Sequence, residues 1–168
     1  MASHPPRLED FSYVGQYRYF LTICVNHRAP IFSNDTVARF VIAQLLKCAK
    51  ARGFEVLAYC AMPDHLHALV VGLTDTSDPK EFVRIFKQGT GHWWKHEQGH
   101  PTPLWQTSFH DRILREADLN DGVIRYILMN PVRARIVEDP REYAYLGAEQ
   151  YDVQALLESS CFWTPPWK

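Results

Sequence analysis

The stretch FEVLAYCAMPDHLHALVVGL, residues 54–73, sets the fold expected for the rest of the chain. Two runs rich in apolar and β-branched residues stand on either side of Pro63 and Asp64, a pair typical of turns. The pattern predicts an antiparallel hairpin. Two histidines, His65 and His67, interrupt the second run, where the sequence otherwise looks built for burial.

The segments around this hairpin predict further strands and helices, from aromatic and β-branched runs and from apolar residues at helical spacing. The expected strands are 17–26, 54–62, 65–73 and 104–115. The expected helices are 33–53, ended by Gly53; 78–98, with Gly89 or Gly91 as the place for a break; and 118–130, limited by Pro131. This order indicates an α+β fold of the ferredoxin-like or RRM-like class, with a mainly antiparallel four-stranded sheet and helices packed on one face.

Length and composition limit the functions to be considered. The 168 residues indicate a single domain, with a core over about 17–137 and a tail, about 138–168, expected to be mostly irregular. Because 18 basic residues face 19 acidic ones, the chain is no general polycation, and nucleic-acid binding would need a local patch. Four cysteines without a C-x-x-C pair favour a cytoplasmic protein without disulfides. No apolar run reaches the roughly 18 residues of a membrane span, so no membrane is expected.

The spacing of the two histidines suggests a metal site. Alternate side chains of a strand share a face, so His65 and His67 point the same way and can converge on one divalent cation. The alternative is two partly buried histidines bonded to the backbone or to water. Two imidazoles on one face of an apolar strand both need partners, because burying them unpaired is unfavourable.

The helix expected at 118–130 offers a third ligand and a reactive group. Tyr126 and Asn130 lie four residues apart, on one helical face. Asn130 can supply an oxygen to a hard cation such as Mg²⁺ or Mn²⁺, with the Tyr126 hydroxyl one turn away. Equally compatible with the sequence is a core tyrosine followed by an asparagine that caps the helix before Pro131.

Three motifs together resemble a known family. MPDHLHALVV is similar to the His-hydrophobic-His motif of HUH single-tyrosine transposases, and VIRYILMNPVRARIV (123–137) resembles the tyrosine helix of one branch, the REP-associated tyrosine transposases. LWQTSFHDRILR (104–115) is similar to the segment between those motifs. Order and spacing agree over about residues 17–137. Related insertion-sequence transposases carry Gln where this chain has Asn130, a difference known within this branch.

The resemblance implies a metal-dependent endonuclease and strand transferase acting on single-stranded DNA. His65, His67 and Asn130 would hold Mg²⁺ or Mn²⁺, and Tyr126 would attack the scissile phosphate to form a covalent 5′-phosphotyrosine. The tyrosine helix would pack over the metal-binding strand. Members of this branch recognise hairpins of repetitive extragenic palindromes (REPs), so hairpin DNA is the expected partner. The chain would work as a monomer or a homodimer, in transposition or in processing palindromes for the host.

Two groups of residues are candidates for contacts with DNA. Segment 82–96 interleaves cations with aromatic residues, which suits phosphate contacts and base stacking. Its candidates are Arg84, Lys87, Trp93, Trp94 and Lys95. A second basic cluster lies near Tyr126 in the sequence and comprises Arg112, Arg115, Arg125, Arg133 and Arg135. The alternative for the first group is a helix with an aromatic inner face and a solvated basic outer face.

Two other classes of function remain open from the sequence. A non-catalytic module that binds single-stranded nucleic acid on its sheet would need neither a metal nor Tyr126. A zinc-dependent hydrolase would use His65 and His67 with Cys60 or His110, and would turn over without a covalent protein–DNA species.

Overall fold

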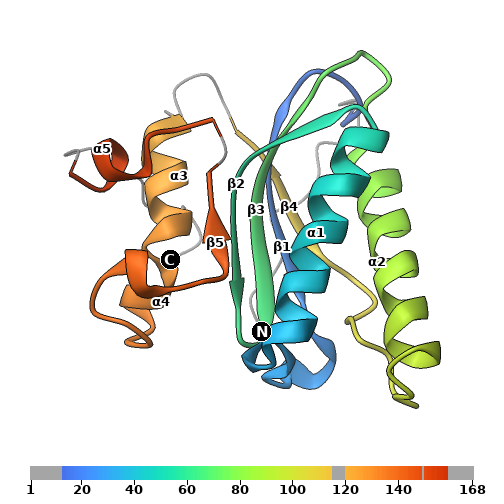
Figure 1. Ribbon diagram of the computed structural model, residues 1–168. Helices are drawn as coiled ribbons and strands as arrows, with labels where there is room; N and C mark the ends of the chain where they lie inside the picture. The colour runs from blue at the N-terminus through green and yellow to red at the C-terminus, as the bar shows by residue number, and fades with distance from the viewer. Residues whose placement is uncertain (1–12, 115–119, 149, 159–168) are drawn as a thin grey trace.

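The computed structural model describes residues 13–114, 120–148 and 150–158. It consists of one antiparallel sheet with helices on both faces (Figure 1). The strands follow the order β4-β1-β3-β2-β5 across the sheet. Their bounds are β1 Arg18–Cys24, β2 Phe54–Met62, β3 His65–Gly72, β4 His110–Ile113 and β5 Leu146–Gly147. The expected α+β class is confirmed, although the sheet has five strands where four were predicted.

The predicted hairpin forms the middle of the sheet. Strands β2 and β3 pair antiparallel across the Pro63-Asp64 turn, with Met62 opposite His65. Strand β1 then pairs with the other side of β3, with Cys24 opposite His65. This register places the start of β3 in the centre of the sheet rather than at an edge, so its side chains are flanked by neighbouring strands on both sides.

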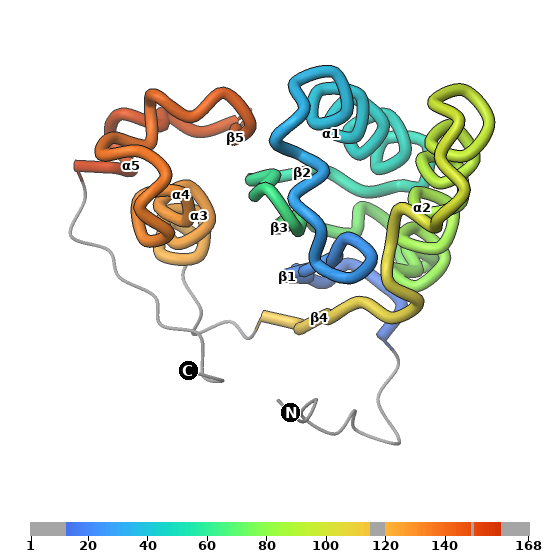
Figure 2. Tube along the Cα trace, turned by 90° about the horizontal axis from the view of Figure 1, so that it is seen from below, coloured from blue at the N-terminus to red at the C-terminus, as the bar shows by residue number. Residues whose placement is uncertain are grey.

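Two helices cover one face of the sheet and form the larger apolar core with it (Figure 2). They are α1 (Asp35–Ala51) and α2 (Pro79–His96). Asn34 caps α1 by accepting from the Val37 amide, and Gly53 follows the helix with a φ of 70°, which a glycine adopts without strain. Helix α2 continues unbroken through Gly89 and Gly91, because neither glycine interrupts its apolar inner face.

The opposite face is covered by α3 (Asn120–Leu128), so the helices do not all pack on one side as the sequence suggested. Alternation along the strands gives both faces apolar residues, and the second face therefore needs a cover of its own. A short helix, α4 (Asn130–Arg133), follows α3 at once. The structure thus confirms that the helix carrying Tyr126 packs over β2 and β3 (Figure 1).

The C-terminal segment is more ordered than its sequence indicated. Within the predicted irregular tail, β5 adds two residues to the edge of β2, and α5 (Val153–Glu158) packs on α3 through the buried Leu156. The Tyr143 hydroxyl donates to the Ala61 carbonyl, 2.8 Å away, which ties this segment to the sheet. Contacts with distant segments hold this part of the chain in place, and such contacts leave no periodic pattern in the local sequence.

The predicted fourth strand is shorter than 104–115. Only His110–Ile113 pairs regularly with β1, while Trp105 makes a single bridge to Val25. Three short 3₁₀ helices complete the described structure, at Asn26–Arg28, Ile31–Ser33 and Pro140–Glu142. None of the helices in the described part of the chain combines the length and apolarity required of a transmembrane segment.

Candidate active site between β3 and α3

The two histidines converge on the face of the sheet that α3 covers. The Nε2 atoms of His65 and His67 lie 3.1 Å apart. Residues directly opposite each other in an antiparallel sheet share a face, so the same row carries Cys60, Thr22 and His110 beside His67. Phe20 stacks on the His67 ring, with 5.3 Å between ring centroids.

Each imidazole has a partner on its other nitrogen. The His65 Nδ1 lies 2.6 Å from the Asp64 carboxylate, and the His67 Nδ1 lies 2.9 Å from the Thr22 hydroxyl. Burial lowers the pKa of His65, against the opposing effect of Asp64. Burial also lowers the pKa of His67 well below its ordinary value, and His65 and Arg133 add to this effect. Both shifts favour the neutral imidazole, which is the form that binds metals.

Tyr126 lies on α3 above these histidines. Its ring centroid is 6.5 Å from that of His67 and 6.1 Å from that of Phe20. On the other side, the Arg133 guanidinium sits 3.8 Å from the ring centroid, a cation–π contact, while its Nη1 donates to the Tyr126 carbonyl at 2.9 Å. The tyrosine is half-buried, and its ring is held by neighbours from β1 and α4.

Asn130 stands at the junction of α3 and α4. Its side-chain Nδ2 donates to the carbonyls of Tyr126, at 3.1 Å, and Ile127, at 3.3 Å. These bonds close the end of α3, as the capping alternative anticipated. They use the amide nitrogen and do not involve the amide oxygen, which is the atom that a hard cation would bind. Capping and metal binding by this residue are therefore compatible.

The distance between the two imidazole nitrogens suits a shared divalent cation. A cation bound at roughly 2.1 Å in octahedral geometry holds neighbouring ligands about 3 Å apart, and the two Nε2 atoms are 3.1 Å apart. Among the described residues, no three His, Cys, Asp or Glu side chains cluster as a metal site. The pair therefore fits a cation that completes its coordination with amide, phosphate or water oxygens.

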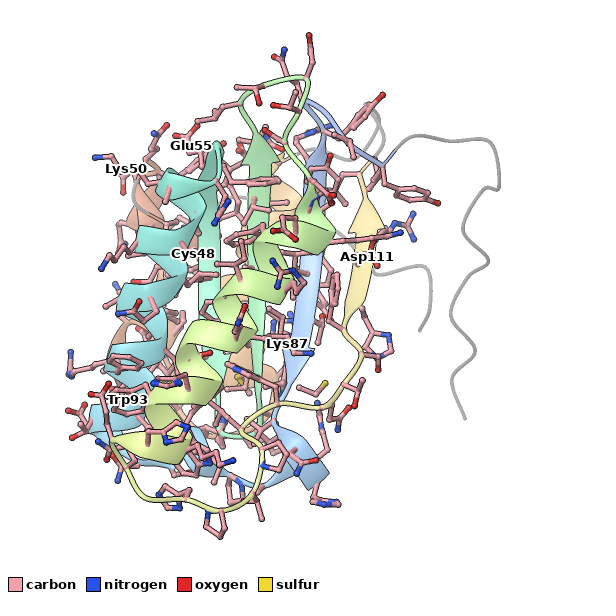
Figure 3. The ribbon with its side chains drawn as sticks, turned by 90° about the vertical axis from the view of Figure 1, so that its right-hand side faces the viewer. Cys48, Lys50, Glu55, Lys87, Trp93 and Asp111 are labelled. Atoms are coloured by element: carbon pink, nitrogen blue, oxygen red, sulfur yellow. The ribbon has the colours of Figure 1, made fainter. Side chains whose placement is uncertain are left out.

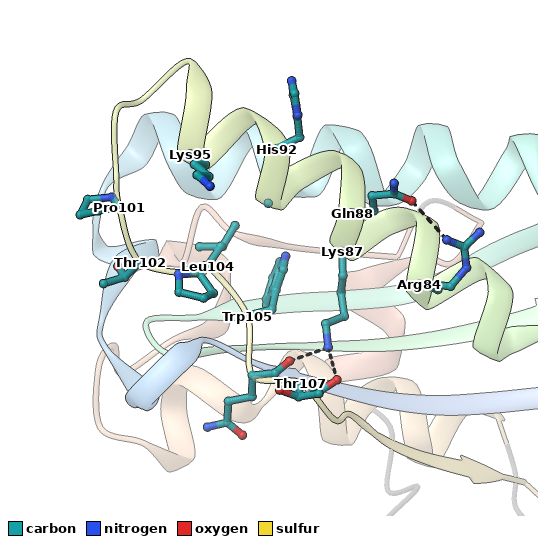
Figure 4. A pocket seen from close by; sticks show the side chains of 13 residues that line it. Arg84, Lys87, Gln88, His92, Lys95, Pro101, Thr102, Leu104, Trp105 and Thr107 are labelled. Carbon is teal, nitrogen blue, oxygen red and sulfur yellow. Dashed lines mark hydrogen bonds between the residues drawn. The ribbon is translucent and has the colours of Figure 1, made fainter.

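The first group of predicted DNA contacts is only partly exposed. The structure buries Trp93, which stacks on Phe40, and Trp94, which stacks on His100, so neither presents a free face to a base. The expectation of exposed stacking residues is wrong for both, because they complete the core and the end of α2. Arg84 and Lys95 are exposed and border a groove of about 560 Å³ between α2 and segment 101–107 (Figure 4).

Lys87 lines the same groove but is already engaged. Its ammonium donates to the carbonyls of Gln106 and Thr107, at 2.5 and 2.9 Å (Figure 4), and to that of Ser108 at 3.4 Å. Partial burial lowers its pKa below the ordinary value. In Figure 3 the side chain reaches from α2 toward the segment that leads into β4. Lys87 thus holds this segment against α2. The sequence predicted a contact with phosphate, whereas in the structure the ammonium is bonded to backbone carbonyls.

We call the side of the sheet that α3 covers, with Phe20, Thr22 and His67, the tyrosine face. Only part of the second group of predicted DNA contacts lies on it. Arg133 covers the Tyr126 ring, and Arg112 stands opposite Phe20 in the β1–β4 register, hence on the same face. Arg125 is half-buried, and its Nη2 donates to the Leu157 carbonyl at 3.4 Å, so it helps hold the C-terminal segment. Arg115 lies outside the described residues.

Three residues of this site were not anticipated from the sequence. Asp64 and Thr22 contact the outer nitrogens of the histidines, and Arg28 forms an ion pair with Asp64 at 2.9 Å between Nε and Oδ2. A carboxylate directly before His65 was a visible signal for Asp64. Thr22 and Arg28 reach the site through strand pairing and a loop, which residue spacing alone does not reveal.

Comparisons with known proteins identify the family of this chain. A model of the family "Transposase IS200 like" matches residues 13–130, so the chain belongs to this family of enzymes. The chain is 27% identical over 156 residues to a protein of Haemophilus influenzae that bears the name of a REP-associated tyrosine transposase. That match covers 87% of this chain and 86% of the relative. The resemblance predicted from the three motifs is confirmed.

Two solved structures share the fold. One is a REP-associated tyrosine transposase bound to a REP hairpin, with a TM-score of 0.69 and 19% identity, covering 97% of this chain and 94% of that one. The other comes from Deinococcus radiodurans and was solved under the name of a transposase, with a TM-score of 0.53 and 22% identity. It covers 77% of this chain and 92% of its own. At these identities, the likeness shows the fold.

Proposed function

We propose that this transposase cuts and rejoins single-stranded DNA at hairpins through a covalent 5′-phosphotyrosine on Tyr126. One observation carries the proposal: Tyr126 is held on α3 directly beside paired histidines, 6.5 Å from the His67 ring. The chain has eight tyrosines, and Tyr126 has both a convergent imidazole pair and a guanidinium against its ring. A phosphate entering beside the histidines would meet the phenol from the side.

His65, His67 and the amide oxygen of Asn130 would hold a divalent cation, Mg²⁺ or Mn²⁺. When bound, such a cation polarises the scissile phosphate and offsets the charge that develops on it. The chain's own residues prepare this function without the cation. Burial lowers the pKa of both imidazoles, which favours their neutral form, and Asn130 donates to the Tyr126 carbonyl at the end of α3, so these two residues are held on one support.

The chemical step exchanges one phosphodiester for another. The Tyr126 oxygen forms a bond to phosphorus, the bond from phosphorus to the 3′-oxygen breaks, and the freed 3′-hydroxyl takes up a proton. The phenol gives up one proton and the 3′-oxygen takes one up, so the exchange consumes no net proton; the Arg133 guanidinium lies 3.8 Å from the Tyr126 ring centroid during this step. Since the phosphotyrosine bond is not hydrolysed, a 3′-hydroxyl can attack it in reverse and join strands.

Hairpin DNA is the substrate that the relatives support. The fold neighbour was solved with a REP hairpin, and the Haemophilus influenzae relative bears the name of the same branch. Arg112 and Arg133, on the face that α3 covers, and the exposed Lys95 beside the groove would meet its phosphates. Arg84 borders the same groove but is paired with Glu81, so it would have to leave that ion pair to bind a phosphate. The chain would act as a monomer or homodimer in the cytoplasm.

The zinc hydrolase has less support than this proposal. Cys60 is fully buried and bonded to Met62, and burial raises the pKa of its thiol to about 12, which disfavours the thiolate that zinc needs. A purely nucleic-acid-binding module would give no reason for two imidazoles and a tyrosine to converge under one helix.

The test is incubation of the protein with Mg²⁺ and a REP-type hairpin carrying single-stranded flanks, followed by a denaturing gel. The wild type should form a covalent protein–DNA adduct. Tyr126→Phe keeps the ring and its packing and should bind the hairpin but form no adduct. Tyr145→Phe is the matched control, because its hydroxyl bonds Asp35 on α1, away from the histidines. An adduct with Tyr126→Phe would assign the chemistry to another residue.

A further inference from the structure

The carboxylate of Asp64 lies next to the histidine pair and has no role in the reaction described above. It sits half-buried in the turn between β2 and β3. One oxygen, Oδ1, is 2.6 Å from the His65 Nδ1, and the other, Oδ2, is 2.9 Å from the Arg28 Nε. Both oxygens are thus engaged on the side of the imidazole ring that faces away from Nε2. Asp64 is placed to act on His65 and not on a cation.

The turn that carries Asp64 is held in place by segment 25–32. The Val25 amide donates to the Asp64 carbonyl at 2.9 Å, and the Phe32 amide donates to the Pro63 carbonyl at 2.9 Å. Arg28 has a φ of 55°, a left-handed conformation unusual for a residue with a side chain, and its Nη1 also contacts the Cys24 sulfur at 2.9 Å. The position of the carboxylate is therefore fixed by backbone and side-chain contacts from a second segment.

The two histidines differ in what their partners allow. An ionised carboxylate only accepts hydrogen bonds, so the His65 Nδ1 facing Asp64 carries the proton and its Nε2 presents a lone pair. The Thr22 hydroxyl facing the His67 Nδ1 can donate or accept, whereas the Leu21 carbonyl, which also hydrogen-bonds the His67 ring, can only accept. The two Nε2 atoms lie 3.1 Å apart, so the Nε2 side of His65 is the side that a cation shared with His67 would occupy.

We propose that Asp64, anchored by Arg28, is a positioning residue of the cation site: it fixes His65 in the tautomer whose Nε2 binds metal. His65 is then a ready ligand before any cation arrives. This inference rests on the proposed function, because it takes His65 and His67 as ligands. Carboxylates that orient metal-binding imidazoles typically affect metal affinity by about 10- to 100-fold.

Two measurements test the proposal. Ring ¹⁵N chemical shifts of the metal-free wild type should show His65 protonated on Nδ1 and not on Nε2. Calorimetric titration with Mn²⁺ should then show that Asp64→Asn, which keeps the size of the side chain, binds about 10- to 100-fold more weakly than the wild type. Arg28→Met should weaken binding in the same direction by a smaller factor. Asp75→Asn, at an exposed carboxylate that bonds Gln16, is the matched control and should bind as the wild type does.

The outcomes separate this inference from the function on which it rests. Wild-type Mn²⁺ binding that Asp64→Asn leaves unchanged overturns the role of Asp64 alone. A wild type that binds no Mn²⁺ overturns the cation assignment as well, and this failure shows in the wild-type titration itself. Should Asp64→Asn not fold, the wild-type spectrum still decides, because a His65 ring protonated on Nε2 contradicts the proposal without any variant.

Discussion

The two faces of the sheet are made from alternate residues of the same strands, yet they are used differently. On the face covered by α1 and α2, β1 contributes Tyr19, Leu21 and Ile23 to a large apolar core. On the face covered by α3, the same strand contributes Phe20 and Thr22, which contact His67. One face is filled with close-packed side chains, and the other keeps a row of polar groups inside an apolar border.

On the face covered by α1 and α2, called here the helix-pair face, the buried Thr90 hydroxyl has hydrogen-bond partners inside the core. The Thr90 hydroxyl donates to the Phe86 carbonyl and accepts from the Trp105 indole, at 2.7 and 2.8 Å, and both bonds stay within the core. On the tyrosine face, His65 and His67 direct nitrogens at each other across 3.1 Å. The comparison therefore contrasts a polar group bonded within the core with two imidazoles whose proposed role is to bind a cation.

The largest expected effect comes from breaking the tyrosine face at its histidine pair. His67→Ala removes a ligand and should abolish Mg²⁺-dependent cleavage of a hairpin substrate, while circular dichroism shows the native fold. The physical reason is that one remaining imidazole cannot hold the cation beside the phosphate. His96→Ala, at an exposed position at the end of α2 and outside the groove lining, is the matched control and should cleave normally. Cleavage by His67→Ala at the wild-type rate would show that the cation is bound elsewhere.

The opposite face should respond in stability and not in chemistry. Phe82 is fully buried and stacks on Phe54, with 5.1 Å between ring centroids. Phe82→Ala should lower the free energy of unfolding by about 3–5 kcal/mol in urea denaturation. Below its melting temperature it should still form the covalent adduct at a rate near that of the wild type.

Phe20→Ala is the counterpart of this variant on the tyrosine face, because Phe20 is equally buried but touches both His67 and Tyr126. It should lose stability and adduct formation together. Equal adduct rates in the two variants would mean that the faces are not separate in function.

The parts of this molecule that could be predicted from sequence are those set by local periodicity. Alternation in the hairpin placed His65 and His67 on one face, and the four-residue spacing placed Tyr126 and Asn130 together. The spacing along α2 also predicts the burial of Trp93, because Trp93 lies eleven residues, or three helical turns, after Phe82 and therefore on the same face of the helix.

What sequence could not provide depends on contacts between distant segments. Strand β5 has two residues, and it exists because the edge of β2 is there to pair with it. The clamp of Lys87 on the carbonyls of 106–108 depends on where α2 lies against that loop. A lysine among aromatic residues has the same appearance in sequence whether it meets a phosphate or a carbonyl.

The smallest expected effect concerns Lys87 and tests whether the helix-pair face takes part in binding DNA. Lys87 and Lys95 both line the groove beside α2, but the ammonium of Lys87 is bonded to carbonyls, whereas Lys95 is exposed. If DNA follows the groove, Lys95→Gln should reduce the salt dependence of hairpin binding by about one unit of slope, because one phosphate contact and its released counterion are lost. Lys87→Gln should leave the slope unchanged and lower the melting temperature, because segment 106–108 loses its hydrogen bonds to α2.

Lys80→Gln, exposed in the first turn of the same helix, controls for the loss of charge and should change neither the slope nor the melting temperature. Fluorescence anisotropy of a labelled hairpin across a salt series measures the slopes. An equal loss of slope in the Lys87 and Lys95 variants would show that Lys87 leaves its carbonyls for phosphate, so that the helix-pair face also takes part in binding DNA.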